Sequence, residues 1–302
     1  MYDIIGDVHG QADLLKDLLS RMGYKEKDKS YFHPQRKAVF VGDFINRGPK
    51  IKETIRLIRN MVEKGHAYAI LGNHEINAIF YTLLDKQGQR LSKRWSRLRL
   101  DLHPTLAEYS SDMDLWKEQV DWMRTLPLFL ELDGIRIVHA CWDDENIRLL
   151  KENLNEPKLK RKFLKKVEKN NKRLSQAFWE TCKGIDFELP KDLLVFDSTG
   201  NAHRTFRSRW WESPKGQTFR ELSFESRFEL PNYTIPAEII ETREPYPDHA
   251  PLVFFGHYCM KDHPNIIKPN ICCVDSCVSR RGKLTAYRWS GETRLKAENL
   301  ID

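Results

Sequence analysis

The sequence predicts an α/β fold around a parallel sheet, because short apolar runs alternate with helix-like stretches along the first 80 residues. Apolar runs at 2–5, 38–41 and 68–71 each stop at a glycine. Short runs of β-branched and aromatic residues that are bounded by glycine are typical of buried strands. A strand–helix–strand–helix–strand order favours parallel pairing with right-handed crossovers.

The stretches between these runs have the spacing of amphipathic helices. Paired leucines place the first helix between Asp13 and Arg21, and Gly23 follows as a stop. Residues 51–62 carry a core-facing stripe of isoleucine and valine, and Gly65 ends the second helix. Both helices therefore fit as crossovers between parallel strands.

The remaining chain adds insertions and further strands to a single domain that we expect to span residues 1–302. The stretch 81–127 is predicted to be mainly helical, and 143–250 is predicted to be a basic, helical, cap-like segment. Residues 128–138 are predicted to form a hairpin across Asp133-Gly134, a strong turn dipeptide. Because the segment 143–250 leaves a strand end on the ligand side of the sheet, we expect it to lie over the site as a cap or rim.

The basic charge of the chain is local. The formal net charge is +7, and the segment from Lys151 to Arg173 holds ten Lys or Arg and three Glu, which accounts for the whole excess. This run is interpreted as a solvated helix face, with a basic rim that steers polyanionic substrates as the functional alternative. Since the run has no recognised nucleic-acid motif, nucleic acid is only weakly supported as a partner.

Neither a membrane span nor a secretory leader is expected. No run approaches the roughly 20 apolar residues that a bilayer crossing needs, and the first strand begins almost at Met1. We therefore expect a cytoplasmic protein with no membrane partner. The six cysteines have no paired C-x-x-C spacing, so we expect buried free thiols, and a zinc site from Cys273 and Cys277 would lack a second pair.

Five apolar runs stop on side chains that bind metals. The six candidate ligands at these strand ends are Asp7, His9, Asp43, Asn73, His139 and His257. In open sheets with helical crossovers, ligands gather outside the carboxyl ends of the strands, so we expect the six to converge. Their mixed donor atoms suit Mn, Fe or Zn better than calcium. Asp43 can place its two oxygens on different metals, and two metals roughly 3.5–4 Å apart would activate a bridging hydroxide for in-line attack on phosphorus.

The order of these motifs resembles the calcineurin-type metallophosphoesterases. The stretches GDVHG, GDFINRG, GNHE, VHA and GH begin at residues 6, 42, 72, 138 and 256. They resemble in particular the phosphoprotein phosphatase branch, which includes symmetrical diadenosine tetraphosphatases, and residues 274–278 and 282–286 resemble closing stretches of the latter. The resemblance covers residues 1–80, 128–142 and 252–290. It implies two packed mixed β-sheets flanked by helices, with a largely helical cap-like insertion.

The resemblance also implies a centre of two divalent metal ions. One ion would be held by Asp7, His9 and Asp43, and the other by Asp43, Asn73, His139 and His257. We expect Mn²⁺ at both positions, with Fe and Zn as alternatives. His74 would protonate the leaving oxygen as the general acid, and Arg47 would clamp the phosphoryl oxygens, so both would bind substrate.

The chain departs from the family pattern at two positions. Asn46 stands where the family has a second Asp, a carboxylate that orients the GNHE histidine in relatives. Asn46 can accept a hydrogen bond from His74 but brings no charge, so we predict a less basic His74 and assign Asn46 to the catalytic group. Cys259 stands where many relatives outside the branch have a second histidine. Water in that place fits the branch, and a Cys259 thiolate ligand is the alternative.

Other residues near these motifs allow two interpretations each. Glu75 is interpreted as a first-turn helix carboxylate, which the helix dipole favours. Asp275 is either a neighbour of the site or a strand-end cap. Arg207 and Arg209 share one strand face, which is either a forked phosphate clamp or a solvated surface.

The predicted function is hydrolysis of a phosphate ester or anhydride by a two-metal enzyme. The sequence leaves the substrate open among a phosphorylated small molecule, a nucleotide such as a dinucleoside polyphosphate, a Ser/Thr phosphoprotein, and an RNA or DNA end. The competing class is a non-catalytic module that binds metal or phosphate, and only Asn46 favours it.

Overall fold

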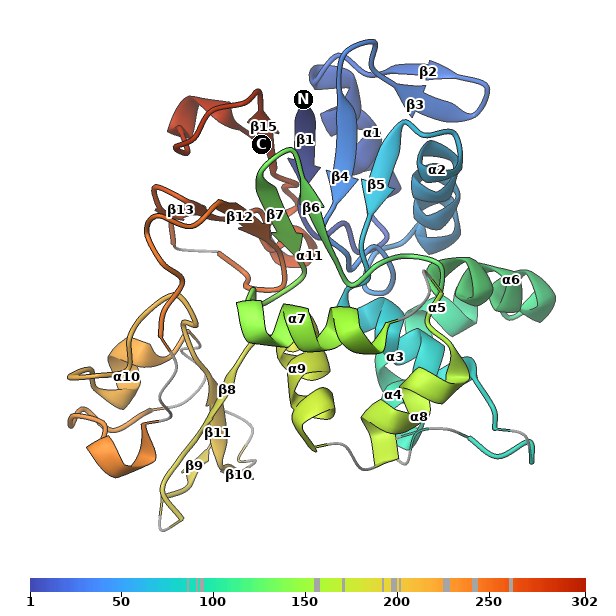
Figure 1. The fold of residues 1–302 in the computed structure, drawn as a ribbon. Helices are drawn as coiled ribbons and strands as arrows, with labels where there is room; N and C mark the ends of the chain where they lie inside the picture. Colours follow the sequence, from blue (N-terminus) through green and yellow to red (C-terminus); the bar gives the residue numbers. More distant parts are fainter. Residues whose placement is uncertain are drawn as a thin grey trace.

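Two five-stranded mixed β-sheets pack face to face at the centre of the molecule, and helices flank them (Figure 1). The computed structural model describes residues 1–85, 87–90, 92, 95–154, 158–169, 172–191, 193–196, 200, 202–224, 229–240, 244–260 and 263–302. The two sheets contain the strands that precede the candidate ligands, so the strand order determines which loops meet.

The first sheet contains the predicted parallel strands. Its order is β16-β15-β1-β4-β5, with the bounds β1 Tyr2–Ile5, β4 Lys37–Phe40, β5 Ala67–Ala69, β15 Ala286–Trp289 and β16 Leu300–Ile301. Strands β1, β4 and β5 are parallel, as predicted, whereas β15 is antiparallel to β1. Helices α1 (Ala12–Arg21) and α2 (Ile51–Glu63) connect these strands. The sequence did not indicate the hairpin of β2 (Lys25–Lys27) and β3 (Ser30–Phe32) that follows α1.

The second sheet combines the predicted hairpin with three later strands. Its order is β13-β14-β12-β7-β6, with the bounds β6 Phe129–Leu132, β7 Ile135–Val138, β12 Leu252–Phe255, β13 Ile266–Lys268 and β14 Ile271–Cys273. Asp133 and Gly134 have φ angles of 47° and 88°, the left-handed values that a two-residue hairpin turn needs. Strand β12 lies parallel to both β7 and β14, so the loops after these three strands leave the same edge.

Alternate residues of the strands face different apolar layers. Ile4 and Phe254 pack in the core between the two sheets. Their neighbours face outward, where Ile5 packs with residues of α1 and α2 and Phe255 packs with Trp210. Because both faces of these strands are buried, a register slip of one residue would exchange the two layers and turn the ligand-bearing loops away from the site.

Helices from both expected insertions lie together beneath the two sheets in the view of Figure 1. The helices that follow α3 (Asn73–Thr82) in these insertions are α4 Trp95–Asp101, α5 His103–Glu108, α6 Met113–Met123, α7 Asp144–Asn153, α8 Arg161–Lys169 and α9 Lys172–Lys183. Within the part of the chain that the structure describes, no helix is both long enough and apolar enough to cross a membrane.

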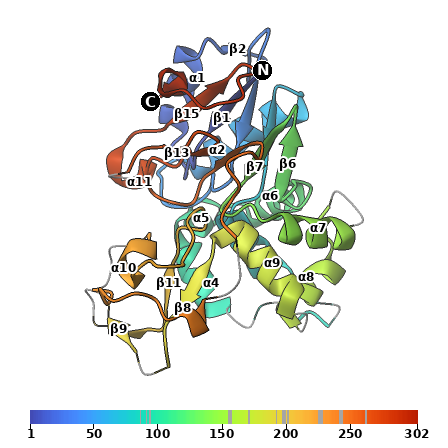
Figure 2. The ribbon, with the colours of Figure 1, turned by 60° about the vertical axis from the view of Figure 1, so that its left-hand side comes forward.

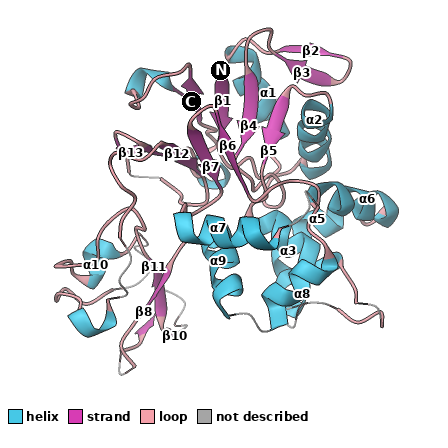
Figure 3. Cartoon of the chain, viewed as in Figure 1, coloured by secondary structure: helices cyan, strands magenta, loops and turns pink. Residues whose placement is uncertain are grey.

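The stretch after Lys183 forms a small lobe instead of continuing the helices (Figures 2 and 3). It holds β8 Asp186–Glu188, β9 Val195–Phe196, β10 Ala202–His203, β11 Thr205–Arg207, α10 Phe219–Leu222 and the 3₁₀ turn η1 Ala237–Ile239. Phe206 and Phe219 belong to a separate apolar cluster of this lobe. The expected helical insertion therefore matches the described residues up to Lys183 and is replaced by short strands beyond it.

The basic segment is anchored to the body of the protein. Leu159, Phe163 and Val167 are buried, which agrees with the predicted apolar face. Several of its cations pair with acidic residues elsewhere in the chain, in the pairs Lys151–Glu131, Lys158–Asp121, Lys165–Asp85 and Arg173–Glu145. These pairs offset part of the positive charge that the sequence concentrates here.

The expectation of six free thiols is wrong for two of the cysteines. A disulfide joins Cys259 to Cys277. The two residues follow the neighbouring parallel strands β12 and β14, and this adjacency brings their Cα atoms to 4.8 Å, a normal disulfide separation. The alternative of a Cys259 thiolate ligand, and that of a zinc site with Cys277, therefore do not hold. Cys141, Cys182, Cys272 and Cys273 are buried free thiols, as expected.

Candidate metal centre

The loops that leave the strand ends of both sheets meet at one place. The first sheet contributes Asp7 and His9 after β1, Asp43 after β4 and Asn73 after β5, and the second contributes His139 after β7 and His257 after β12. All of these except the partly exposed His257 are at most 9% exposed. His9, Asp43 and His257 have φ angles of 44°, 53° and 63°, so the chain turns sharply at each of them.

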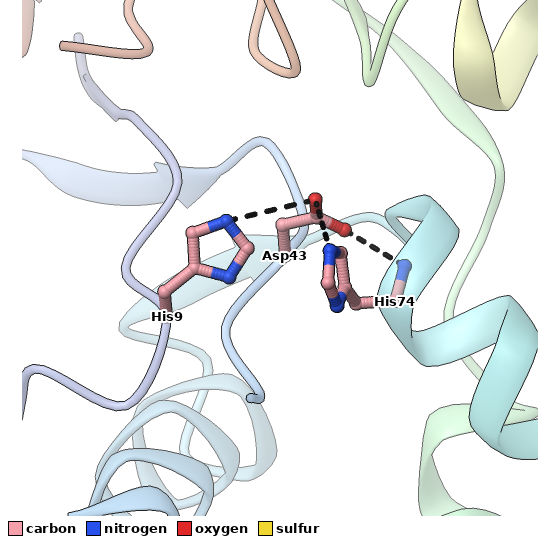
Figure 4. A group of neighbouring side chains, drawn as sticks. All are labelled: His9, Asp43 and His74. Carbon is pink, nitrogen blue, oxygen red and sulfur yellow. Dashed lines mark hydrogen bonds and ion pairs between the residues drawn. The ribbon is translucent and has the colours of Figure 1, made fainter. Parts of the chain in front are cut away.

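Asp43 lies at the centre of this group. Its Oδ2 atom is 3.9 Å from His9 Nε2, 3.8 Å from His74 Nε2 and 3.4 Å from His139 Nε2. His9 and His74 approach the carboxylate from two sides (Figure 4). Asp43 belongs to two sets of converging ligand atoms, one with His9 and His74 and the other with His139 and His257. One carboxylate shared by two sets of ligands is the arrangement that a two-metal centre requires.

Backbone carbonyls orient two of the imidazoles. His9 Nδ1 lies 3.0 Å from the carbonyl oxygen of Ile45, and His139 Nδ1 lies 2.7 Å from that of Val41. A carbonyl only accepts, so each Nδ1 carries a proton and each Nε2 faces Asp43. Burial lowers the pKa of His9 to about 3, so this ring is a neutral potential ligand at neutral pH.

The atoms that face the centre need a cation between them. His139 Nε2 lies 3.2 Å from Asn73 Oδ1 and 3.4 Å from Asp43 Oδ2, and the Asp43 carboxylate outweighs burial and raises the pKa of His139, so a positive charge is favoured between these atoms. His257 Nε2 is buried and has no hydrogen-bond partner among the described residues. Unpaired buried acceptors are costly, and a divalent metal with N and O ligands would satisfy them. The residues therefore fit the metal ions that the family uses.

Buried carboxylates also accumulate here. Asp7, Asp43 and Asp275 are at most 6% exposed. Burial raises the pKa of Asp7 well above its ordinary value, and the charges of Asp275 and Asp43 raise it further. Of the two interpretations of Asp275, the structure therefore supports that of a neighbour of the site. Its Oδ1 atom also accepts the Cys277 N–H at 2.8 Å.

Two motif glycines leave room for the carboxylates. A Cβ atom on Gly72 would lie 2.1 Å from Asp43 Oδ1, and one on Gly256 would lie 2.1 Å from Asp7 Oδ1. Carbon and oxygen atoms cannot approach so closely without displacing the carboxylate. The glycines before Asn73 and His257 therefore set the positions of Asp43 and Asp7.

Glu75 has a contact pattern that its place in the first turn of α3 did not indicate. The side chain is fully buried, and its Oε2 atom accepts the N–H groups of Asp43 at 2.8 Å and Gly72 at 2.9 Å. Its Oε1 atom accepts those of Phe44 at 3.1 Å and Ile45 at 3.2 Å. Burial and the nearby Asp43 raise the pKa of Glu75 to about 7. Of these four bonds, only the one to Gly72 could be predicted from the sequence, since the side chain of the third residue of a helix often accepts the backbone N–H of the cap residue.

His74 lies between Arg47, Asn46 and Asp43. Arg47 Nη2 is 3.3 Å from His74 Nε2, and the His74 backbone N–H donates to Asp43 Oδ1 at 2.9 Å. The Asn46 side chain turns its amide nitrogen toward His74 Nδ1 at 2.7 Å. The other end of the amide is bonded to the hydroxyl of Thr105, and the direction of the Asn46–His74 hydrogen bond depends on which ring nitrogen carries the proton. Burial lowers the pKa of His74.

A cleft of about 1080 Å³ extends away from this centre. Asn73 and His257 line it together with Trp179 of α9, Phe187 of β8 and the two arginines Arg207 and Arg209. The charge of Arg207 contributes, after burial, to the low pKa of His257, and its guanidinium carbon lies 5.5 Å from the centre of the Tyr258 ring. Arg207 therefore lies next to the candidate metal ligands.

Comparison with known proteins identifies the family. A family model described as calcineurin-like phosphoesterase matches residues 2–260. The chain belongs to this family. The match confirms the predicted metallophosphoesterase resemblance, and the two mixed sheets confirm the predicted fold class. Members of this family use divalent metal ions, which agrees with the two converging sets of ligands.

The chain is also similar to individual relatives and to a solved structure, over different shares of its length. The asymmetrical bis(5'-nucleosyl)-tetraphosphatase PrpE of Oceanobacillus iheyensis is 35% identical over 147 residues, which cover 46% of this chain and 54% of the relative. PrpE of Halalkalibacterium halodurans is 45% identical over 89 residues, which cover 29% and 36%. These matches span only about a third to a half of the relatives' length. A cold-active protein-tyrosine phosphatase of a Shewanella species shares the fold, with 15% identity, a TM-score of 0.54 and coverage of 95% and 74%.

Proposed function

We propose that this phosphoesterase hydrolyses phosphate esters or anhydrides with two divalent metal ions that share Asp43. The observation that carries the proposal is the position of the Asp43 carboxylate within 4 Å of three imidazole Nε2 atoms. When bound, such ions would polarise the phosphoryl group and lower the pKa of a water molecule. The first ion would take Asp7, His9 and Asp43, and the second would take Asp43, Asn73, His139 and His257.

We propose Mn²⁺ as the native metal, with Fe and Zn as alternatives. Imidazole nitrogen together with carboxylate and amide oxygen forms a borderline ligand set that suits these ions. Burial keeps His9 neutral at neutral pH, so this ring needs no deprotonation before it binds a metal.

We assign proton donation to His74 and phosphoryl binding to Arg47. His74 Nε2 faces Asp43 and Arg47, so a phosphoryl group held by Arg47 would lie within reach of this nitrogen. An anionic phosphoryl group would stabilise the protonated ring against the effect of burial. Arg207 would bind further phosphate oxygens, because it lines the cleft beside His257. Asn46 would orient His74.

We propose a dinucleoside polyphosphate or a similar phosphorylated small molecule as the substrate. The two PrpE relatives described above are named bis(5'-nucleosyl)-tetraphosphatases. A cleft of about 1080 Å³ is large enough for a nucleotide and far exceeds a single phosphate group. Residues 81–127 and 143–250 would act as insertions of one domain that wall this cleft. A Ser/Thr phosphoprotein or a nucleic-acid end is the alternative substrate. A cytoplasmic location remains an expectation from the sequence.

A substrate panel with product analysis tests this proposal. The Mn²⁺-loaded protein is given diadenosine tetraphosphate, a phosphothreonine peptide, a 2′,3′-cyclic nucleotide and end-phosphorylated RNA, and an Arg207→Met variant is assayed beside it. We expect the highest kcat/KM on the tetraphosphate and a selective loss on that substrate in the variant. Faster turnover of the peptide or of the RNA would mean that the substrate is a phosphoprotein or a nucleic-acid end instead. No turnover on any of the four would support a binding module.

A further inference from the structure

Asn77 lines the cleft with an amide oxygen that has no hydrogen-bond partner among the described residues. It lies on α3, one turn after the candidate ligand Asn73, which lines the same cleft. Asn77 is 5% exposed, and the atom without a partner is its buried Oδ1. A buried polar atom of this kind destabilises a folded protein, and most such atoms are paired. A ligand group in the cleft would supply the missing partner.

A buried asparagine with a structural role looks different in this protein. Asn146 on α7 is fully buried, and both ends of its amide are bonded. Its Nδ2 atom donates to Glu180 Oε2 at 2.7 Å, and its Oδ1 atom accepts from Arg173. The oxygen of Asn77 has no such contact, and an apolar residue would suit its place on α3 better. The packing of α3 therefore does not account for an amide at residue 77.

The side chains along α3 follow the order of the parts of a nucleotide. Asn73 is the first residue of the helix, and Asn77 lies about 6 Å further along the helix axis. Phe80 follows about 4.5 Å beyond Asn77, and the centre of its ring is 5.7 Å from that of Trp179, which lines the cleft. A phosphoryl group at the candidate metal centre therefore places the sugar of a nucleotide beside Asn77 and its base toward Trp179.

A ribose hydroxyl matches the chemistry of this amide. An asparagine side chain offers an acceptor and donors, and a hydroxyl group both donates and accepts, so the two can bond in either orientation of the amide. The oxygens of an ionised phosphate only accept, and their partners in the cleft are cations such as Arg207 and Arg209. The rings of Trp179 and Phe187 line the same cleft and offer apolar surface to a base.

We propose that Asn77 is a specificity-determining residue that binds a ribose hydroxyl of a nucleotide substrate. The proposal rests on the proposed function, because the position of the sugar follows from a phosphoryl group held at the metal centre. Asn77 then serves binding at the expense of stability. Since Asn77→Leu removes a buried amide oxygen without a partner, we expect this variant to melt at the wild-type temperature or above it.

Binding of ribose and deoxyribose analogues tests the proposal without turnover. The Mn²⁺-loaded protein is titrated by calorimetry with α,β-methylene-ADP, which resists hydrolysis at its bridge, and with the 2′-deoxy and 3′-deoxy forms of this analogue. We expect the wild type to bind the ribose form about five- to ten-fold more tightly than at least one deoxy form, which is the effect of one hydrogen bond. Asn77→Leu should bind all three forms with equal affinity. Equal affinities in the wild type, or the same preference in Asn77→Leu, would overturn the proposal.

A matched substitution on another helix serves as the control. Asn60 on α2 is not among the residues that line the cleft, and its Nδ2 atom donates to the carbonyl of Lys29 at 2.8 Å. Asn60→Leu makes the same chemical change as Asn77→Leu at a site without ligand contacts. We expect it to keep the wild-type preference for the ribose form. Loss of that preference in Asn60→Leu would mean that the effect comes from the helix and not from the cleft, which would overturn the proposal.

Turnover and melting separate recognition of the sugar from a structural role. We expect Asn77→Leu to lower kcat/KM on diadenosine tetraphosphate about ten-fold, mainly through KM, and to lose much less on nitrophenyl phosphate, which has no ribose. Asn77→Ala, with a smaller side chain, should behave in the same way. A lower Tm with equal losses on both substrates in both variants would overturn the proposal. If the wild type does not hydrolyse the tetraphosphate but prefers the ribose analogue, the proposed substrate fails and the role of Asn77 stands.

Discussion

The carboxylate of Glu75 lies against the backbone of Asp43 and accepts its N–H at 2.8 Å. The same carboxylate binds the next two backbone N–H groups, so it fills a small nest of donors in the loop after β4. Asp43 at the start of this loop has a left-handed φ of 53°, and Asn46 follows with 66°. Non-glycine residues adopt such angles at a cost, which surrounding contacts must offset. Glu75 therefore stabilises the conformation that presents Asp43.

We predict that Glu75→Gln weakens metal binding. The amide would turn an NH₂ group toward two backbone N–H donors, and each lost bond at a buried site costs about 1–3 kcal/mol. The measurement is an Mn²⁺ titration by calorimetry together with a thermal melt. Glu108→Gln is the matched control, since Glu108 also accepts two backbone N–H groups, those of Ile51 and Lys52, at the start of α2. Equal Mn²⁺ affinity in the two variants would contradict the role of Glu75.

The metal-free protein should lose stability in acid because of His9. Burial lowers the pKa of His9 to about 3 in the folded state, whereas the ordinary value is 6.5. Between these values the unfolded chain binds one more proton, so stability falls as the pH falls through this window, by up to about 1.4 kcal/mol per pH unit for this group. Melting curves from pH 7 to pH 4 check the slope. His9→Gln, which cannot titrate, should show a shallower decline, and an identical slope would contradict the assignment.

Asn46→Asp should raise turnover on substrates with poor leaving groups. A carboxylate would accept from His74 Nδ1 and favour the charged ring, while Thr105 could still donate to its second oxygen. We expect kcat on an alkyl phosphate to rise several-fold, which lies below the full effect of a general acid. The aryl ester serves as the internal control and should change little. An equal rise in kcat on both esters would contradict a role of Asn46 in protonation of the leaving group.

Reduction of the disulfide should loosen the loop that carries His257. The bond between Cys259 and Cys277 ties the loop after β12 to the loop after β14 and closes a segment with a sequence separation of 18. A disulfide that closes a loop of this size stabilises a folded protein by about 3 kcal/mol. We expect a lower Tm and weaker Mn²⁺ binding in dithiothreitol and in Cys277→Ser. Cys182→Ser, at a buried free thiol, keeps the disulfide, so without reductant its Mn²⁺ binding should match that of the wild type. A thiol count of six in the untreated, denatured protein would contradict the bond itself.

The convergence of the candidate metal ligands could be predicted because each follows a strand that the sequence marks clearly. Val39 and Phe254 belong to short apolar runs that stop at a glycine, and parallel strands bring the ends of such runs together. The role of Glu75 could not be predicted, because its donors lie about 30 residues earlier and meet it only when β4 and α3 are packed. Thr105 belongs to a stretch without a recognisable motif, and its contact depends on how α5 packs over the loop after β4. The disulfide depends on the order of β12 and β14.

The metal content of the wild type and of Asp43→Asn tests the shared position of Asp43 most directly. Both proteins are equilibrated with Mn²⁺, desalted and measured by plasma mass spectrometry, with Asp13→Asn as a control at an exposed carboxylate. Because Asp43 belongs to both sets of ligands, its loss should weaken the binding of both ions. The account predicts two Mn²⁺ per chain in the wild type and in Asp13→Asn, and fewer than one in Asp43→Asn. Two ions retained in Asp43→Asn would contradict it.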